Sequence, residues 1–403
     1  MIFKVFFFLF CLTFVWQRLD FAAQMSVLPI PGGEWRLKSP TVKDAMGGLV
    51  ASLTQNPDVT KVSLPSCFIY PYSLCELAAF RALRFQHELM EIEKLKSPLD
   101  RILQVTRWFM TSMEQMESMS KKPFNPVLGE TLSCWVIDPS AGPTLLKVEQ
   151  VCHHPPVTAI CMRNEQRNIQ FSSNVVFGIT FHGNSVSCKL QGRADVELGN
   201  LKETYTAPNW VPDVIIQNVL FGTRRQLWSG NWSLSCQATG LGVKISVTEV
   251  NANAGWLSAL KSGMYENLVS GFVYKLSDPS ETPLKVISGH AGRKIYVADA
   301  KSDEKELLVD CDALKMEEIH FEPEAERSET NSLVIWKKSI AALLVDDLQT
   351  ADKEKTLVEM TQREIRKQRE EKGEKFVPKF FQLDEASNKY VPLPNALKDI
   401  NVK

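Results

Sequence analysis

The sequence predicts a mainly β with α protein, and three patterns along the chain indicate this fold class. Between about residues 123 and 308 the chain consists of short β-rich runs separated by Gly, Asn, Asp and Pro. Helical spacing of apolar residues precedes this region, and helix-length runs follow it. Repeated short antiparallel strands over so long a stretch favour a barrel or a sandwich over parallel βαβ units.

Length and charge exclude several classes of protein. The chain has 403 residues, of which 44% are hydrophobic, and 46 basic residues stand against 47 acidic ones, for a net charge of −1. The hydrophobic share is too high for a disordered chain, and a nucleic-acid-binding protein usually has a basic surplus. With no internal repeat and no low-complexity linker, residues 25–403 are expected to form a single domain, and no nucleic-acid partner is expected.

The N-terminus and the cysteines favour different compartments. Residues 2–16 are nearly all apolar and resemble the hydrophobic core of a signal peptide, being shorter than a spanning helix requires. The nine cysteines are an odd number without CxxC spacing, which is typical of a reducing compartment and gives no support for a zinc site. Two interpretations of residues 1–24 therefore stay open: a signal or anchor, or an upstream extension before a start at Met25.

Helical segments are expected before the β-rich region. Residues 34–56 are mildly amphipathic and could form a short helix or a flap. In residues 73–96 apolar side chains recur at intervals of three and four, as in an amphipathic helix. A second helix is expected to begin at Pro98 or Asp100, because proline is common in a first helical turn. The helical region thus spans about residues 73–118.

The β-rich region divides into separate strands. The predicted strands include 131–137, 144–151, 175–181, 185–190, 232–236, 243–248, 269–276 and 294–298. Several of these runs alternate apolar and polar residues, which is the pattern of a half-buried strand.

A C-terminal subdomain is expected over about residues 309–403. Residues 333–348 contain a bulky apolar run of helix length, and residues 351–372 are charge-rich without Gly or Pro. The second of these runs predicts a largely exposed helix. The tail from residue 376 onward contains three prolines and is expected to be irregular.

No segment carries a recognised catalytic arrangement. The sequence lacks the GxSxG, HExxH, Walker and GxGxxG patterns, and its six histidines show no metal-ligand spacing apart from one adjacent pair. Adjacent residues of a strand point to opposite faces, so such a pair rarely binds one metal. An enzyme is therefore not expected, and neither is a metal or a cofactor.

The most unusual segment is EQVCHHPP at residues 149–156. The two prolines restrict the backbone, so His153 and His154 are expected to be held stiffly at the end of a strand. An imidazole beside an anion gains a proton and becomes a cation with two donors, for which a phosphate is a natural partner. The alternative is a structural histidine pair that is satisfied within the protein.

Two further segments carry cations in suggestive positions. In KKPFNPVLGE at residues 121–130, Lys122 precedes a proline-rich corner and could bind a phosphate as a point charge. On the helix from residue 351, Lys355, Glu359 and Arg363 are spaced at i, i+4 and i+8 and so share one face. The alternatives are an ordinary solvated turn and a solvated, charged helix face.

Taken together, these three segments resemble the oxysterol-binding protein family. EQVCHHPP is similar to the family fingerprint, with Cys152 where serine is usual, and both the 122–130 segment and the helix with Gln362 and Arg363 match the family pattern. The resemblance extends from about Trp35 to Phe381 and covers almost the whole chain.

The resemblance implies a fold and a ligand. The family fold is an incomplete antiparallel β-barrel around a hydrophobic tunnel, with an N-terminal lid. Lys122, His153, His154, Lys355 and Arg363 would hold the headgroup of phosphatidylinositol 4-phosphate. Glu359 would contact the headgroup or brace the two cations of its helix. The second ligand in the tunnel would be a sterol in many members and phosphatidylserine in others.

The resemblance also implies how the protein would work. The lid would cover about residues 29–60, where Trp35, Leu37, Met46, Leu49 and Val50 would cover the tunnel or contact a bilayer; the alternative for these residues is plain core packing. Mutual exclusion of the two lipids would allow exchange between membranes by a cytosolic, peripherally associated protein, at membrane contact sites among other places. The alternative function is a lipid sensor or scaffold that signals through a partner.

Overall fold

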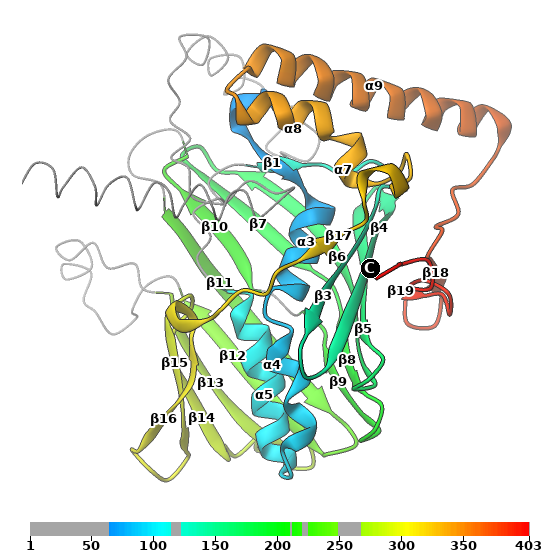
Figure 1. Ribbon diagram of the computed structural model, residues 1–403. Coiled ribbons are helices and arrows are strands. Elements are labelled where there is room, and N and C mark those ends of the chain that lie inside the picture. The colour runs from blue at the N-terminus through cyan, green and yellow to red at the C-terminus, as the bar shows by residue number, and fades with distance from the viewer. Residues whose placement is uncertain (1–63, 114–121, 210–211, 220–224, 249–266, 403) are drawn as a thin grey trace, which may run out of the picture.

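The computed structural model describes residues 64–113, 122–209, 212–219, 225–248 and 267–402 (Figure 1). The expected N-terminal extension at 1–24 and the expected lid at 29–60 lie outside these residues. So do the five lid side chains Trp35, Leu37, Met46, Leu49 and Val50.

One large antiparallel sheet dominates the described part of the chain and contains 15 strands there. The strands are β3 (Thr131–Asp138), β4 (Gly142–His153), β5 (Pro156–Asn164), β6 (Ile169–Phe181), β7 (Ser185–Gln191), β8 (Ala194–Leu198), β9 (Glu203–Ala207), β10 (Asp213–Gln217), β11 (Arg225–Cys236), β12 (Leu241–Thr248), β13 (Leu268–Lys275), β14 (Lys285–His290), β15 (Lys294–Asp299), β16 (Lys305–Asp310) and β17 (His320–Phe321). Each of the eight predicted strands falls on one of them.

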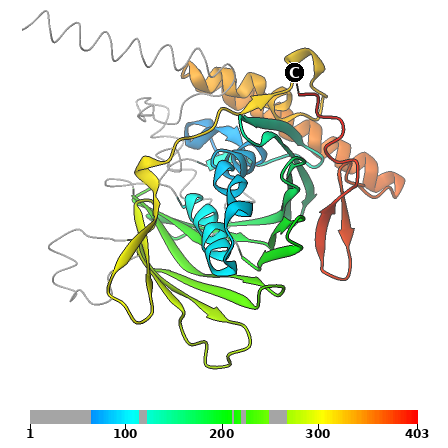
Figure 2. The same ribbon diagram turned by 60° about the horizontal axis from the view of Figure 1, so that its bottom comes forward.

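The sheet curves into a barrel that does not close. Its path runs β16-β15-β14-β13-β12-β11-β10-β7-β6-β5-β4-β3-β17, while β8 and β9 bridge β6 and β11 beside it. Within the described residues β16 and β17 end this path without pairing to each other. Figures 1 and 2 show the resulting arc, with helices inside it. The prediction of a mainly β fold with an incomplete antiparallel barrel is thus confirmed.

Three helices occupy the inside of the arc: α3 (Leu74–Leu83), α4 (His87–Met90) and α5 (Pro98–Thr111). Ser73 and Ser97 cap α3 and α5, because each side chain accepts a backbone N–H two residues later. The second helix begins at Pro98, as predicted. The first does not run through residues 73–96: it breaks into α3, α4 and a 3₁₀ turn at Ile92–Lys94.

The C-terminal helices are α7 (Ser332–Ile335), α8 (Lys337–Leu344) and α9 (Leu348–Lys372). The apolar run at 333–348 thus forms two short helices rather than one. The charged helix begins at Leu348, three residues before the predicted start, because Asp347 accepts the N–H of Thr350 at 3.0 Å. It ends at Gly373, whose φ of 69° is the left-handed conformation that closes many helices.

The tail was expected to be irregular, and this is wrong in part. It contains a hairpin of β18 (Phe381–Asp384) and β19 (Lys389–Pro392), which docks on the outside of the large sheet (Figure 1). The buried Lys389 ammonium donates to Asp195 of β8 at 2.6 Å and to Ser172 of β6 at 2.9 Å. These contacts fasten the end of the chain to the barrel wall.

Across the described residues, no helix is both apolar enough and long enough to cross a membrane. A small parallel pair, β1 (Ile69–Ser73) with β2 (Lys122–Phe124), completes the fold. This pair, α8 and α9 lie together at one end of the barrel in Figure 1, and side chains from all of them share one apolar cluster.

Candidate functional site

The EQVCHHPP segment forms the hairpin end where β4 leads into β5. A register irregularity lies between Gln150 and Cys152, after which His153 pairs with Pro156. The Gln150 amide fixes this end: it donates to the Cys152 carbonyl at 2.8 Å and accepts the Thr158 hydroxyl at 2.6 Å. The two histidines are therefore held at a strand end, as the sequence predicted.

The histidine rings lie side by side at the surface of this end. Their centroids are 4.8 Å apart with an angle of 66° between the planes. Nδ1 of His153 is buried and has no hydrogen-bond partner among the described residues. Burial of the ring, together with the nearby charges of His154 and Arg366, lowers the pKa of His153 below its ordinary value. The imidazole of His153 is therefore neutral at neutral pH.

Arg366 of α9 contacts the pair directly. Its Nη1 lies 3.3 Å from Nε2 of His154, and because a guanidinium only donates, Nε2 is the acceptor. We did not predict a site role for this residue from the sequence, where it counted only as one of several nearby charges. The signal was available, since Arg366 continues the stripe of Lys355, Glu359 and Arg363 by almost one further turn.

The predicted stripe on α9 is a chain of ion pairs. Lys355 is buried, and its ammonium lies 3.0 Å from Glu359. The exposed Arg363 lies 3.8 Å from the other oxygen of Glu359. Glu359 thus stands between the two cations in the described structure.

The 122–130 segment reaches the histidine hairpin through its backbone. The N–H of Gly129 donates to the Gln150 carbonyl at 2.9 Å, and the N–H of Gln150 donates to the Glu130 carbonyl at 2.8 Å. Burial raises the pKa of the Cys188 thiol of β7, and Lys122 of β2 lies close enough for its positive charge to oppose this rise.

Two acidic residues of these motifs accept hydrogen bonds from other parts of the chain and so stabilise the fold. Glu130 is fully buried and accepts the Ser73 hydroxyl, the Trp336 indole N–H at 2.9 Å and the Val127 N–H at 3.0 Å. Glu149 accepts the backbone N–H groups of Lys379 and Phe380, which begin the tail, at 2.7 and 2.8 Å. Neither carboxylate is available to a ligand.

All three sequence segments therefore meet at one end of the barrel (Figure 1). The hairpin touches α9 through His154 and Arg366, and it touches the 122–130 segment through Gln150. At this end the molecule presents two imidazoles and several cations beside an apolar cluster of β6, β7 and the C-terminal helices. This arrangement can bind a phosphate, because it provides charge-assisted donors from two directions.

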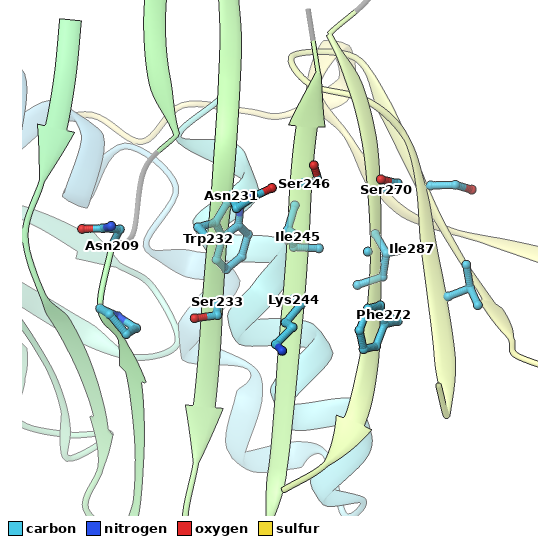
Figure 3. A pocket seen from close by; sticks show the side chains of 14 residues that line it. Asn209, Asn231, Trp232, Ser233, Lys244, Ile245, Ser246, Ser270, Phe272 and Ile287 are labelled. Atoms are coloured by element: carbon cyan, nitrogen blue, oxygen red, sulfur yellow. The ribbon is translucent and has the colours of Figure 1, made fainter. Parts of the chain in front are cut away.

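A separate hollow of about 620 Å³ lies on the outer face of β11–β14 (Figure 3). Asn231, Ser246, Ser270 and Ser288 form one cross-strand row of its lining, and Trp232 and Ile245 belong to the row that faces the core. None of the predicted site residues lines this hollow. It lies on the opposite side of the sheet from the barrel interior.

Comparison with known proteins agrees with the motifs. A family model described as oxysterol-binding protein matches residues 49–342. Oxysterol-binding protein 10 of Dictyostelium discoideum is 27% identical over 347 residues, which cover 86% of this chain and 84% of that protein.

Two solved structures share the fold. The crystal structure of the Osh1 ORD domain with ergosterol has a TM-score of 0.67 at 20% identity and covers 92% of this chain and 90% of its own. The Osh3 ORD of Saccharomyces cerevisiae in complex with PI(4)P has a TM-score of 0.64 at 19% identity. The match covers 88% of this chain and 94% of the Osh3 chain. At these identities the likeness concerns the fold.

Proposed function

Because the chain belongs to the oxysterol-binding protein family, we propose that it exchanges phosphatidylinositol 4-phosphate for a second lipid between membranes. The second lipid is a sterol or a phospholipid, held in the same tunnel as the acyl chains of the phosphoinositide. The fold is one of lipid binding and transfer, and the related Osh1 and Osh3 domains were solved with ergosterol and PI(4)P.

The observation that carries the proposal is the histidine hairpin beside α9. His153 has a buried Nδ1 with no hydrogen-bond partner among the described residues, and a buried polar atom normally has one. Arg366 brings a permanent positive charge to the neighbouring ring. A phosphate monoester supplies both missing elements, namely acceptor oxygens and negative charge.

The remaining cations extend the same site. Lys355 and Arg363 would contact the phosphorylated inositol from α9, with Glu359 orienting both, and Lys122 would approach from β2. The apolar chains of the lipid would lie inside the barrel, because acyl chains need a closed apolar cavity during an aqueous crossing.

The test is a double substitution, His153→Ala with His154→Ala. Two charge-assisted hydrogen bonds contribute about 3–6 kcal/mol together, so extraction of phosphatidylinositol 4-phosphate from liposomes should fall by roughly 100-fold or more. The matched control is His290→Ala with His320→Ala, which removes two imidazoles from other strands of the same sheet. Circular dichroism and thermal unfolding should be the same for both variants.

Two results would contradict the proposal. Unchanged extraction by the histidine variant would refute the headgroup assignment. A wild-type protein that extracts both lipids but moves neither between two liposome populations would be a sensor or scaffold instead of a carrier.

A further inference from the structure

Three neighbouring strands line the barrel interior with a row of side chains that includes polar groups. Val214 of β10 pairs with Trp228 of β11 on one side and with Cys188 of β7 on the other. Because paired residues share a face and alternate residues return to it, Gln226 lies on the same inner face as Trp228. Trp228 and Val214 are completely buried in the main core, which identifies this face as the interior.

Two of these side chains carry unsatisfied polar atoms. Both the oxygen and the nitrogen of the Gln226 amide are buried without a hydrogen-bond partner among the described residues. The indole N–H of Trp228, two residues along the same strand face, is in the same situation. Leaving such groups unpaired costs about 1–3 kcal/mol each, so their retention at one place calls for a ligand.

The guanidinium of Arg81 approaches Trp228 from the opposite wall of the barrel. Helix α3 packs against β3, β4 and β5, and its Arg81 side chain crosses the interior to put its guanidinium 5.4 Å from the centroid of the Trp228 ring. Burial lowers the pKa of Arg81 to about 10, and the charge of Arg84 acts in the same direction. The guanidinium therefore remains charged at neutral pH.

Several side chains at this point are not fully buried. Arg81, Gln226, Phe177 and Cys188 all face inward, yet each keeps part of its surface accessible. Burial raises the pKa of the Cys188 thiol to about 12, against the opposing charges of Lys122 and Arg81. Cys188 is therefore close to both cations, so Arg81 lies near the end of the barrel that carries Lys122.

We propose that Arg81, Gln226 and Trp228 form a subsite inside the barrel for the phosphodiester group of a glycerophospholipid. The guanidinium, the amide NH₂ and the indole N–H are all donors, and one of them is permanently charged. A phosphodiester offers a negative charge and several acceptor oxygens, whereas a sterol offers one neutral hydroxyl. The inference rests on the proposed function, in that it requires a lipid inside the barrel, and it names a glycerophospholipid as the second cargo.

The test compares extraction of three labelled lipids from phosphatidylcholine vesicles: phosphatidylserine, phosphatidylcholine and cholesterol. Arg81→Met keeps the length of the side chain and removes its donors. It should lower extraction of both glycerophospholipids by roughly tenfold to a hundredfold and leave cholesterol extraction unchanged. Gln226→Leu keeps the charge and should lower glycerophospholipid extraction by roughly threefold to tenfold.

The matched control is Lys244→Met, which removes one positive charge from the outer face of the same sheet, where Lys244 pairs with Glu281 at 2.5 Å. It should extract all three lipids as the wild type does. If Arg81→Met fails to fold by circular dichroism, Gln226→Leu alone decides the question.

Two outcomes would overturn the subsite. One is unchanged glycerophospholipid extraction by folded Arg81→Met, or by Gln226→Leu where that variant decides. The other is an equal loss of cholesterol and glycerophospholipid, which would mean that Arg81 only packs the interior against Trp228. The proposed function is tested separately, by measuring extraction of phosphatidylinositol 4-phosphate by the wild type and the dependence of that extraction on His153 and His154. If that extraction succeeds while Arg81→Met behaves as wild type, only the subsite fails.

Discussion

At the scale of single residues, the headgroup site depends on how its charges are arranged before a ligand arrives. His153 is held neutral by burial and by neighbouring positive charge, while Lys355 is already paired with Glu359. Arg366 is different, since it contacts Nε2 of His154 at 3.3 Å and the carboxylate of Glu370 at 3.7 Å near the surface. Surface pairs of that kind contribute little, so Arg366 can turn to a phosphate at small cost.

Arg366→Met should therefore lower the affinity for vesicles containing phosphatidylinositol 4-phosphate by roughly tenfold, the loss of about one charge-assisted hydrogen bond. Co-sedimentation with such vesicles measures this. The control is Lys367→Met, the adjacent residue, whose ammonium pairs with Glu371 at 3.8 Å. Equal affinities for the two variants would show that Arg366 contributes only general surface charge.

At the scale of elements, Glu130 joins three parts of the chain. Its carboxylate accepts donors from the start of α3, from the turn at Val127 and from Trp336, which stacks on Phe124 of β2 with centroids 4.4 Å apart. Burial raises the pKa of Glu130, and the hydrogen bonds to Ser73 and Trp336 oppose this. This buried acceptor therefore joins the three parts of the chain through hydrogen bonds within the protein.

Glu130→Gln should lower the free energy of unfolding by about 1–3 kcal/mol, because one acceptor oxygen becomes an NH₂ that faces another donor. Urea unfolding measures the loss, and the exposed Glu374→Gln should change it by less than about 0.5 kcal/mol. A free energy of unfolding equal to that of the wild type would mean that the hydrogen bonds of the Glu130 carboxylate do not stabilise the fold.

The elements differ in how well the sequence predicts them, for identifiable reasons. Strands such as β7 and β12 alternate apolar and polar residues, so the sequence pattern alone is sufficient to predict them as strands. The helical pattern of residues 73–96 continues across the breaks after α3 and α4, where tertiary contacts such as the bond from Gln86 to Glu317 at 2.7 Å decide the path. The tail hairpin was missed because its prolines favour irregular structure, and its Lys389–Asp195 contact joins residues 194 positions apart.

For the candidate site, too, the sequence predicts local patterns but not contacts between distant residues. The fingerprint and the helical spacing identify His153, His154 and the Lys355 stripe, since these are local patterns. The approach of Arg366 to His154 joins residues 212 positions apart and depends on where α9 crosses the barrel. No local pattern contains that information.

At the scale of the whole molecule, the tail hairpin works as a clamp on the outside of the barrel. Directly before the hairpin, the ring centroid of Phe380 lies 4.1 Å from the ammonium of Lys147 on β4. Burial alone would raise the pKa of Asp195, but Lys389 and its hydrogen-bonded neighbours hold it below its ordinary value. The pair therefore stabilises the fold above about pH 4, where the aspartate is ionised in the unfolded chain. This stabilisation is lost as the pH falls through the lowered pKa of Asp195 in the folded protein.

Lys389→Met should lower the free energy of unfolding by about 1–3 kcal/mol at neutral pH, because it removes the buried cation of Asp195 and leaves only Arg193, at 3.1 Å. The difference from the wild type should shrink as the pH falls below about 4, when Asp195 becomes protonated in both states. Denaturant unfolding at several pH values measures this, with the exposed Lys398→Met as control. A difference that stays constant with pH would exclude the ion pair as its cause.

The neutral His153 beside Arg366 gives lipid loading a further property. On the proposed function, a phosphate dianion at Nδ1 favours the imidazolium, so the ring takes up a proton when the headgroup arrives and gives it back when the headgroup leaves. Each round of exchange would then carry hydrogen ions as well as lipid. Loading would strengthen as the medium acidifies from pH 8, until the phosphate itself becomes protonated near about pH 6. Local acidity at a membrane would thus bias which way the carrier runs.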